Sequence, residues 1–274
     1  MFLAKDLAVS NVIERAAGRS TFGSDPAKYD WARPRYPEAV YHLLRERCGL
    51  RPGARTFEVG PGTGIATRRL LELGARPLIA IEPDERLAAF LQQAVESDAL
   101  QIVHSSFEDA ALPEGSFDLG ASATAFHWLE QEPSLAKAHR QLKPGGWWAM
   151  WWNHYGELGK YDDFDRATWH LFAPTKRSPS QGSGGEITFD GNVEERVADL
   201  TRAGFSGIHH ERMRTSFTFE TEQLVALYGS FSVVLHLTPD ERTKFLSNLT
   251  TIIDRDFGGR VERPLTTNIY IAQR

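Results

Sequence analysis

The sequence predicts an α/β fold with a seven-stranded, mostly parallel sheet, helices on both faces and a helical cap. Short apolar segments alternate with helical segments of ten or more residues between about 54 and 153, a pattern typical of strand–helix–strand units. The expected strands are apolar on both faces, as they are when helices cover both sides of a sheet. After about residue 155 this alternation stops and helical segments predominate.

The first residues, 1–37, are expected to form an arm that precedes the sheet. Ser24 or Asp25 is expected to cap a short helix that carries Pro26 in its first turn. Residues 38–48 predict an amphipathic helix, which the following Gly and Pro residues end.

The core is expected to span residues 38–155. Its strands are expected at RTFEVG, PLIAIEP, LQIVHSSF, FDLGASATAF and WWAMWWNH, and the helices between them at GIATRRLLELG, DERLAAFLQQAVES and EPSLAKAHRQLKPGG. Because each strand but the third is followed by a helix, most neighbours in the sheet are expected to run parallel.

The rest of the chain is expected to form a helical cap, residues 156–258, and a closing core strand, residues 259–274. One further core strand is expected near residues 206–219. Helices are expected at 160–172, 193–203, 221–234 and 239–256, with Thr238 as N-cap and Pro239 at the first position of the last. The Ser- and Gly-rich segment 176–192 predicts a loop.

Three glycines at alternate positions, Gly60, Gly62 and Gly64, lie between the first strand and its helix. Glycines there permit a tight turn and let a ligand approach the backbone closely, at the sheet edge where open α/β folds bind ligands. Glu82 ends the second strand, about 20 residues further on, where a carboxylate binds a ribose diol in nucleotide-binding folds. The alternative is a tight turn without a ligand.

The glycine spacing departs from the G-x-G-x-x-G dinucleotide fingerprint. The third glycine comes one residue early, and Ile65 stands where the fingerprint requires Gly. An adenosine-bearing cofactor other than NAD therefore fits this loop better than NAD does. The misplaced third glycine counts against the alternative function, a nicotinamide oxidoreductase.

Several motifs in order resemble the class I S-adenosylmethionine-dependent methyltransferases. FEVGPGTG looks like their first motif, IAIEPDERL like the ribose-binding segment, SSFEDAALPEGSFDLGASATAFHWL like the adenine turn and fourth strand, and LKPGGWWAMWW like the fifth-strand motif. The likeness covers roughly half of the chain. YDWARPRYP and the HW after the fourth strand look like the small-molecule branch, which includes trans-aconitate and quinone-biosynthesis methyltransferases.

This resemblance implies a Rossmann-like fold, S-adenosylmethionine as methyl donor and S-adenosylhomocysteine as product. The residues that it implies for the cofactor are Tyr29, Arg33, Glu58, Gly60, Pro61, Gly62, Thr63, Gly64, Glu82, Pro83, Ser106, Phe107, Glu108, Ala123 and Thr124. One departure concerns the adenine turn, where the family often has an acidic residue and this chain has Ser106 and Phe107. Adenine recognition is then expected from the Ser106 hydroxyl, the Phe107 amide and apolar stacking.

Methyl transfer from a sulfonium is an in-line displacement, in which the protein mainly aligns the nucleophile and excludes water. A general base is needed only when the nucleophile carries a proton. The hypothesis for His127 is that it orients or deprotonates an acceptor hydroxyl, or packs on the cofactor; the alternative is ordinary packing.

Tyr29 and Arg33, four residues apart, are expected on one helical face, with Arg33 toward the methionine carboxylate or, alternatively, stapling the arm to the core. The residues expected to line the acceptor pocket are His127, Trp128, Trp152, Asn153, Tyr228 and Phe231. Trp151 and His154, near the end of the same strand as Trp152, are expected to line it as well. Aromatic residues there favour a flat or apolar acceptor.

Composition limits the other classes. Net charge is -5 and no half of the chain is strongly basic, so no nucleic-acid partner is expected. No apolar run reaches the ~18 residues of a membrane span. Cys48 is the single cysteine, which excludes an internal disulfide and fits a cytoplasmic location. His209 and His210 are adjacent in a strand and point to opposite faces, so no metal is expected.

The functional expectation is methyl transfer to oxygen, nitrogen or carbon of a small molecule. A non-catalytic protein that binds S-adenosylmethionine remains the alternative of a different class, because cofactor motifs indicate binding only. The acceptor's identity and the oligomeric state stay open.

Overall fold

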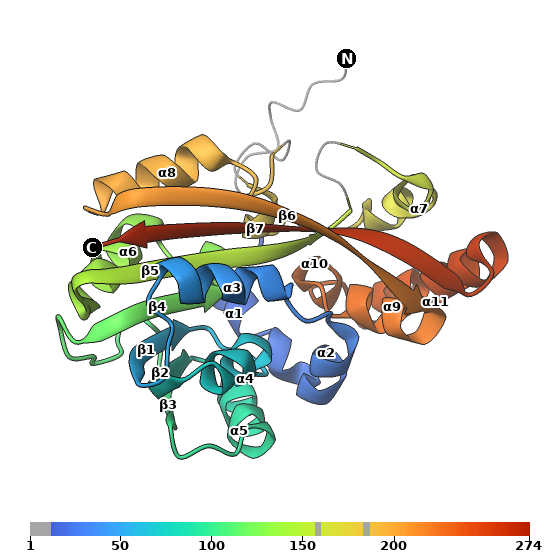
Figure 1. The fold of residues 1–274 in the computed structure, drawn as a ribbon. Coiled ribbons are helices and arrows are strands. Elements are labelled where there is room, and N and C mark those ends of the chain that lie inside the picture. Colours follow the sequence, from blue (N-terminus) through green and yellow to red (C-terminus); the bar gives the residue numbers. More distant parts are fainter. Residues whose placement is uncertain (1–11, 157–159, 183–186) are drawn as a thin grey trace.

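The structure, a computed structural model, describes residues 12–156, 160–182 and 187–274. The first eleven residues of the predicted arm, the start of the predicted cap and residues 183–186 of the predicted loop lie outside the described residues. The strands form one seven-stranded sheet in the order β3-β2-β1-β4-β5-β7-β6 (Figure 1). Their bounds are β1 Ala54–Val59, β2 Ala75–Glu82, β3 Leu100–His104, β4 Phe117–Ala123, β5 Leu142–Tyr155, β6 Ser206–Glu220 and β7 Arg260–Gln273.

The predicted α/β class is confirmed. The first five strands pair in parallel, whereas β7 runs antiparallel to both β5 and β6. The strand order reverses between β1 and β4, since β1 leads outward to β2 and β3 on one side and β4 lies on the other. Ligands in open α/β sheets bind at such a reversal.

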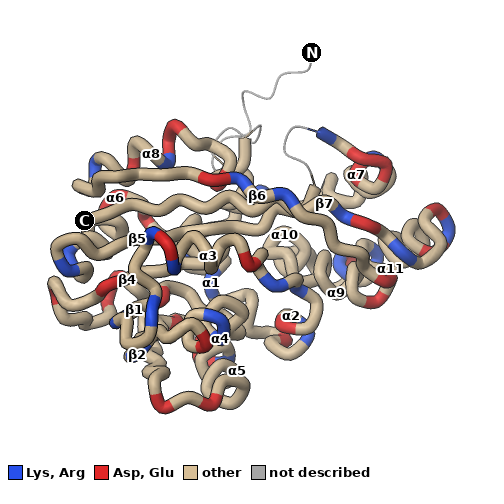
Figure 2. The backbone as a smooth tube through the Cα atoms, viewed as in Figure 1, with Lys and Arg blue, Asp and Glu red and all other residues tan. Residues whose placement is uncertain are grey.

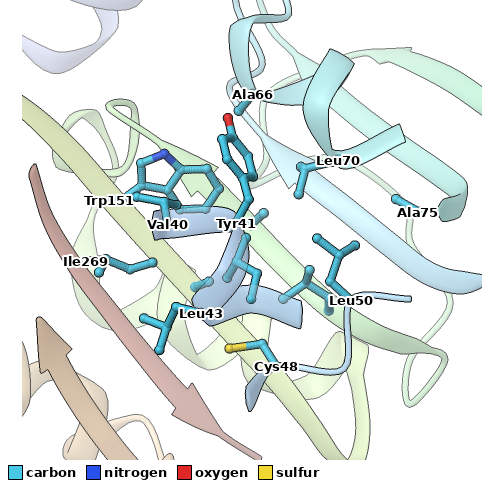
Figure 3. Packing of buried hydrophobic residues seen from close by; sticks show 14 of the residues in the cluster. Val40, Tyr41, Leu43, Cys48, Leu50, Ala66, Leu70, Ala75, Trp151 and Ile269 are labelled. Carbon is cyan, nitrogen blue, oxygen red and sulfur yellow. The ribbon is translucent and has the colours of Figure 1, made fainter. Parts of the chain in front are cut away.

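One face of the sheet is covered by α3 (Glu38–Arg47), α4 (Ile65–Glu72) and α5 (Glu85–Ala94). Figure 3 shows Val40, Tyr41 and Leu43 of α3 packed near Trp151 and Ile269 of the sheet. The other face is covered by α6 (Gln131–Gln141) and α8 (Val193–Arg202), whose apolar residues pack on Phe57, Trp148 and Met150 among others.

Local capping explains several boundaries. Asp25 caps α2 (Pro26–Ala32) by accepting from the Lys28 amide at 3.0 Å, so of the two predicted caps Asp25 is confirmed. Thr238 is the N-cap of α11 (Pro239–Phe257), as predicted, and it also forms a capping box with Glu241. The helical arm that precedes α2 comprises α1 (Arg15–Arg19) and η1 (Phe22–Ser24).

The cap contains α7 (Asp163–Thr168), α9 (Thr221–Gly229), α10 (Ser232–Leu235) and α11, which share a third apolar cluster. In Figure 1, α9 and α11 lie at the ends of β6 and β7 remote from the C terminus.

Two predicted helices are wrong in extent. The 160–172 helix is only α7, followed by the 3₁₀ turn Trp169–Phe172, and η4 (Pro179–Gln181) follows in the predicted loop. The 221–234 helix breaks after Gly229, because Ser230 turns its hydroxyl onto the Leu227 carbonyl at 2.6 Å and the backbone of Phe231 is extended.

Charges of both signs are interspersed along the described elements, for example on α8 and α11 (Figure 2). Among the described residues, no helix is both long enough and apolar enough to cross a membrane.

Candidate functional site

A cavity of about 500 Å³ lies at the carboxyl ends of β1, β2, β4 and β5. One half is lined by the glycine loop after β1 and by the ends of β2 and β4. The other half lies between the end of β5 and the cap. The two halves are continuous, so a ligand in one can meet a ligand in the other.

The glycine loop forms an open cradle in the first half. Gly62 has a φ of 58°, and a Cβ built there would meet no protein atom within 4 Å, so a side chain would enter open space. Gly60 has a φ of 67°, and its Cβ would approach that of Ala125 to 2.6 Å. Both positions require glycine because a left-handed backbone disfavours a side chain. The loop therefore presents bare backbone to the cavity.

Glu82 lies beside this cradle and is buried. Its Oε2 accepts from the Gly62 amide and its Oε1 from the Asp84 amide, each at 3.0 Å. Burial raises the pKa of Glu82 to about 7, and these two amides limit the rise. A carboxylate held in this way can accept further hydrogen bonds from a diol.

Glu58 lies beneath the loop, on the face covered by α4, and does not line the cavity. Its Oε2 accepts from the Thr67 hydroxyl at 2.7 Å, whereas Oε1 has no partner among the described residues. Burial raises the pKa of Glu58 to about 7. Gly64, which caps α4 with a φ of 86°, also lies outside the cavity lining.

Two threonines border the same half of the cavity. The hydroxyl of Thr63 is buried and has no partner among the described residues. Thr124, directly after β4, has a φ of 54° and hydrogen-bonds Tyr36 at 2.9 Å. A β-branched residue in the left-handed region is strained, and such strain concentrates at ligand sites.

Arg33 and Tyr29 line the cavity together. The guanidinium of Arg33 lies 4.3 Å from the ring centroid of Tyr29, and its hydrogen bonds to Ser230 are long, 3.4 and 3.5 Å. Within the described ranges Arg33 forms no ion pair with a carboxylate. A mostly buried cation without an anionic partner, open to the cavity, suits a ligand carboxylate.

The arm covers the cavity near the end of β3. Arg19 donates to both carboxylate oxygens of Glu108, at 2.7 and 3.1 Å, and to the Trp128 carbonyl at 2.8 and 3.1 Å. Gly18 packs so closely on the Trp128 ring that a Cβ would lie 2.0 Å from it. Arg19 therefore ties the arm to two walls of the cavity, a contact that no sequence motif indicates.

In the segment expected to contact adenine, some residues line the cavity and one does not. Phe107 and Glu108 line the cavity, as do Pro61, Pro83 and Ala123. Ser106 does not, because its hydroxyl donates to Asp109 at 2.7 Å and accepts from the Asp109 amide. That hydroxyl contact explains why Ser106 turns away from the space in which it was expected.

His127 is buried and lines the cavity where its two halves meet. Its Nδ1 accepts from the Trp152 indole N–H at 3.0 Å. Burial lowers the pKa of His127 to about 3, and the charges of Arg33 and Arg15 lower it further. Since an indole only donates, the neutral ring carries its proton on Nε2. His127 can therefore donate a hydrogen bond to a ligand but has no free lone pair for a proton.

The second half of the cavity combines aromatic walls with acidic groups. Tyr228, Phe231, Tyr155 and Phe172 line it, with Tyr228 and Phe231 rings 4.9 Å apart. Trp128, Trp152 and Asn153 also line it, and Asn153 accepts from Thr267 at 2.7 Å. Trp151, the neighbour of Trp152, points to the opposite face and packs on Tyr36 and Tyr41, so the expectation that it lines the pocket is wrong.

Two carboxylates at this end come from the cap. Asp190 is buried, and its Oδ2 accepts from Asn268 at 2.7 Å, while Oδ1 has no hydrogen-bond partner in the described part of the chain. Asp165 pairs with the buried Arg263 at 2.5 Å, as does Asp162. Asp165, Asp190 and Arg263 could not be predicted as cavity residues from the sequence, because they lie in segments without a recognisable motif.

No group of three or more His, Cys, Asp or Glu side chains in the described ranges could hold a metal ion. Buried Cys48 ends α3 and packs in the core of Figure 3.

The chain is similar in sequence to proteins described as methyltransferases. Residues 57–150 match the family model described as a methyltransferase domain. An uncharacterised methyltransferase of Schizosaccharomyces pombe is 26% identical over 85% of this chain and 87% of its own length.

Solved structures show the same fold. A putative type II methyltransferase of Anaeromyxobacter dehalogenans superimposes with a TM-score of 0.60 and 23% identity, over 88% of this chain and 96% of that one. A phosphoethanolamine N-methyltransferase of Haemonchus contortus, solved with S-adenosylhomocysteine, gives a TM-score of 0.58 at 12% identity, over 94% of this chain and 60% of that one.

Proposed function

The chain belongs to the class I S-adenosylmethionine-dependent methyltransferases, and on that premise we propose that it methylates a small, flat, largely apolar acceptor that enters the second half of the cavity. The observation that carries the proposal is the continuity of the glycine cradle with an aromatic chamber in one cavity of about 500 Å³. Ligand pockets of this kind typically measure about 300–1,000 Å³.

The first half offers one partner to each part of the cofactor. The loop from Gly60 to Thr63 gives close backbone approach, the Glu82 carboxylate accepts from the ribose diol, and Arg33 pairs with the methionine carboxylate. The unpartnered Thr63 hydroxyl and the open space at Gly62 fit the same ligand. S-adenosylmethionine supplies a methyl group that is already activated on a sulfonium centre.

The second half determines the class of acceptor. Aromatic side chains line its walls, and Tyr161 and Trp169 remain exposed at its lining, 74% and 69% respectively. Such surfaces favour a planar apolar body over a sugar or a phosphate. Asp190 and the paired Asp165 make the inner end acidic, so a hydroxyl or amine donor suits it better than an anion.

The protein contributes alignment and the exclusion of water. Arg19 holds the arm over the cavity by its hydrogen bonds to Glu108 and Trp128. Buried His127 can donate a hydrogen bond from Nε2 and so orient an acceptor oxygen. Positioning of this kind is worth about 7–11 kcal/mol in favourable cases. No covalent step on the protein is required.

The test has two stages. Calorimetry with S-adenosylhomocysteine and, separately, NAD is expected to give heat with the first ligand only. Methyl-labelled S-adenosylmethionine is then incubated with panels of phenols, carboxylic acids and amines. Label transfer to a small acceptor supports the proposal. Binding without transfer to any panel indicates a non-catalytic cofactor-binding protein, and heat with NAD alone would favour an oxidoreductase.

A further inference from the structure

A second histidine, His154, lines the acceptor half of the cavity. It is the last residue but one of β5, and the alternation of side chains along a strand places it on the same face as Trp152. Neither of its ring nitrogens hydrogen-bonds to any residue that the structure describes. The imidazole therefore keeps a lone pair available to a ligand in the cavity.

The two cavity histidines differ in what they can do with a proton. The Nδ1 of His127 is occupied by the Trp152 indole at 3.0 Å, so its free nitrogen carries a hydrogen. His154 has no such constraint. Of the two, only His154 can accept a proton from a bound acceptor without first breaking a buried hydrogen bond.

The surroundings of His154 suit that task. Burial lowers its pKa, Asp190 and Asp165 oppose that effect, and Arg263 adds to it. Asp190 lies in the loop before α8, Asp165 on α7 and Arg263 on β7. At pH 7 and above the imidazole ring of His154 is therefore neutral. The two carboxylates stabilise the imidazolium that forms when the ring accepts a proton.

We propose that His154 is the general base of the reaction and that the acceptor carries its nucleophile as a hydroxyl on an aromatic ring. The inference rests on the proposed function. The acceptor oxygen forms its bond to the methyl carbon, the carbon–sulfur bond breaks with its electron pair remaining on sulfur, and the hydroxyl proton goes to the free nitrogen of His154. Asp190 and Asp165 stabilise the imidazolium until the proton leaves to solvent.

The first arm of the test needs no acceptor. Long-range ¹H–¹⁵N NMR of the full chain with saturating S-adenosylhomocysteine reports the protonation of each histidine between about pH 5 and 9. His127 is expected to keep its hydrogen on Nε2 throughout. His154 is expected to be neutral at pH 7–8 and to gain a proton at lower pH. A charged His154 at pH 8 overturns the proposal, and Asp190→Asn is expected to lower its pKa further.

The second arm uses phenols of different acidity with labelled S-adenosylmethionine. General-base catalysis contributes about 100- to 10,000-fold, so His154→Gln is expected to lower kcat at least about 100-fold with phenol. With 4-nitrophenol, at a pH where it is already ionised, the loss is expected to stay below about tenfold. The matched control is His42→Gln, on the exposed side of α3, which is expected to change neither rate.

The outcomes separate the two proposals. If S-adenosylhomocysteine does not bind, the proposed function fails. If it binds and acceptors other than phenols are methylated, the methyltransferase proposal stands and the hydroxyl acceptor is wrong. Equal losses for phenol and ionised 4-nitrophenol in His154→Gln would assign the residue a structural role. No methylation of any phenol also overturns the inference.

Discussion

Replacement of Glu82 by Gln is expected to change stability and cofactor affinity in opposite directions. Burial raises the pKa of Glu82 from its ordinary value of 4.5 to about 7. A shift of this size corresponds to about 3 kcal/mol. Because the native state binds the proton more tightly than the unfolded chain, the contribution of Glu82 to stability falls as pH rises from about 4.5 to 7, and the cost persists above 7.

Glutamine removes the buried charge but keeps a single carbonyl oxygen. One of the two amides now bonded to Glu82, those of Gly62 and Asp84, then loses its acceptor, at a cost of about 1–2 kcal/mol. The net gain at pH 8 is about 1–2 kcal/mol for the ligand-free protein. That gain is expected to raise Tm by about 2–8 °C.

Affinity for S-adenosylhomocysteine is expected to fall about 10- to 100-fold in the same variant, because a hydrogen bond to a charged group contributes about 1.5–3 kcal/mol. In the wild-type protein the affinity is expected to rise as pH increases through about 7, where Glu82 ionises. The Gln variant is expected to lose this dependence.

Thermal unfolding of the ligand-free protein and calorimetry with S-adenosylhomocysteine, both as a function of pH, measure the two effects. Glu46→Gln, on the exposed side of α3, is the matched control and is expected to change neither quantity. An affinity of Glu82→Gln for S-adenosylhomocysteine within about twofold of wild type would rule out the assigned ribose contact. A lower Tm at pH 8 would rule out the cost assigned to the buried charge.

Three further substitutions test other parts of the site. Gly62→Ala is expected to lower the affinity for S-adenosylhomocysteine, measured by calorimetry, at least about tenfold. Gly258→Ala is the control, because Gly258 has a similar φ of 64° and equally open space. That variant carries the same ~1–2 kcal/mol of backbone strain and is expected to keep the affinity. Arg33→Met is expected to lower the affinity for S-adenosylhomocysteine about 10- to 100-fold. The affinity for 5′-methylthioadenosine, which lacks the carboxylate, is expected to fall by less than about threefold. Equal losses of affinity for the two ligands would contradict the assigned ion pair. Trp152→Phe leaves Nδ1 of His127 without a donor and is expected to cost about 1–3 kcal/mol in denaturant unfolding, an expectation that an unchanged midpoint would rule out.

The half of the cavity that we propose for the cofactor could be located from the sequence because its residues lie next to strand ends. The glycine loop follows β1 directly, and Glu82 ends β2, so the parallel pairing of these two strands brings them together. The sequence could not tell which side of β1 faces the cavity. Glu58 points under α4 toward Thr67, on the side away from the ligand space.

The half that we propose for the acceptor could not be located from the sequence, because segments far apart in the chain build it. Asp165, Asp190 and Arg263 belong to α7, a loop and β7, and only the folded cap brings them to one end of the cavity. Because side chains alternate along β5, Trp151 and Trp152 were bound to point to opposite faces of the sheet. Which of the two faces carries the cavity depends on where the cap packs, and the sequence does not indicate that. Hydrogen bonds between distant elements also determine which nitrogen of a histidine is free, as the Trp152 indole does for His127, and the sequence does not show them.

A crystal structure of the protein with S-adenosylhomocysteine is the decisive test of the proposed cofactor site. We expect ribose hydroxyls within hydrogen-bond distance of the Glu82 carboxylate, the loop backbone at Gly62 against the ligand, and the ligand carboxylate on Arg33. A ligand bound elsewhere, or one whose ribose contacts no atom of Glu82, would contradict it.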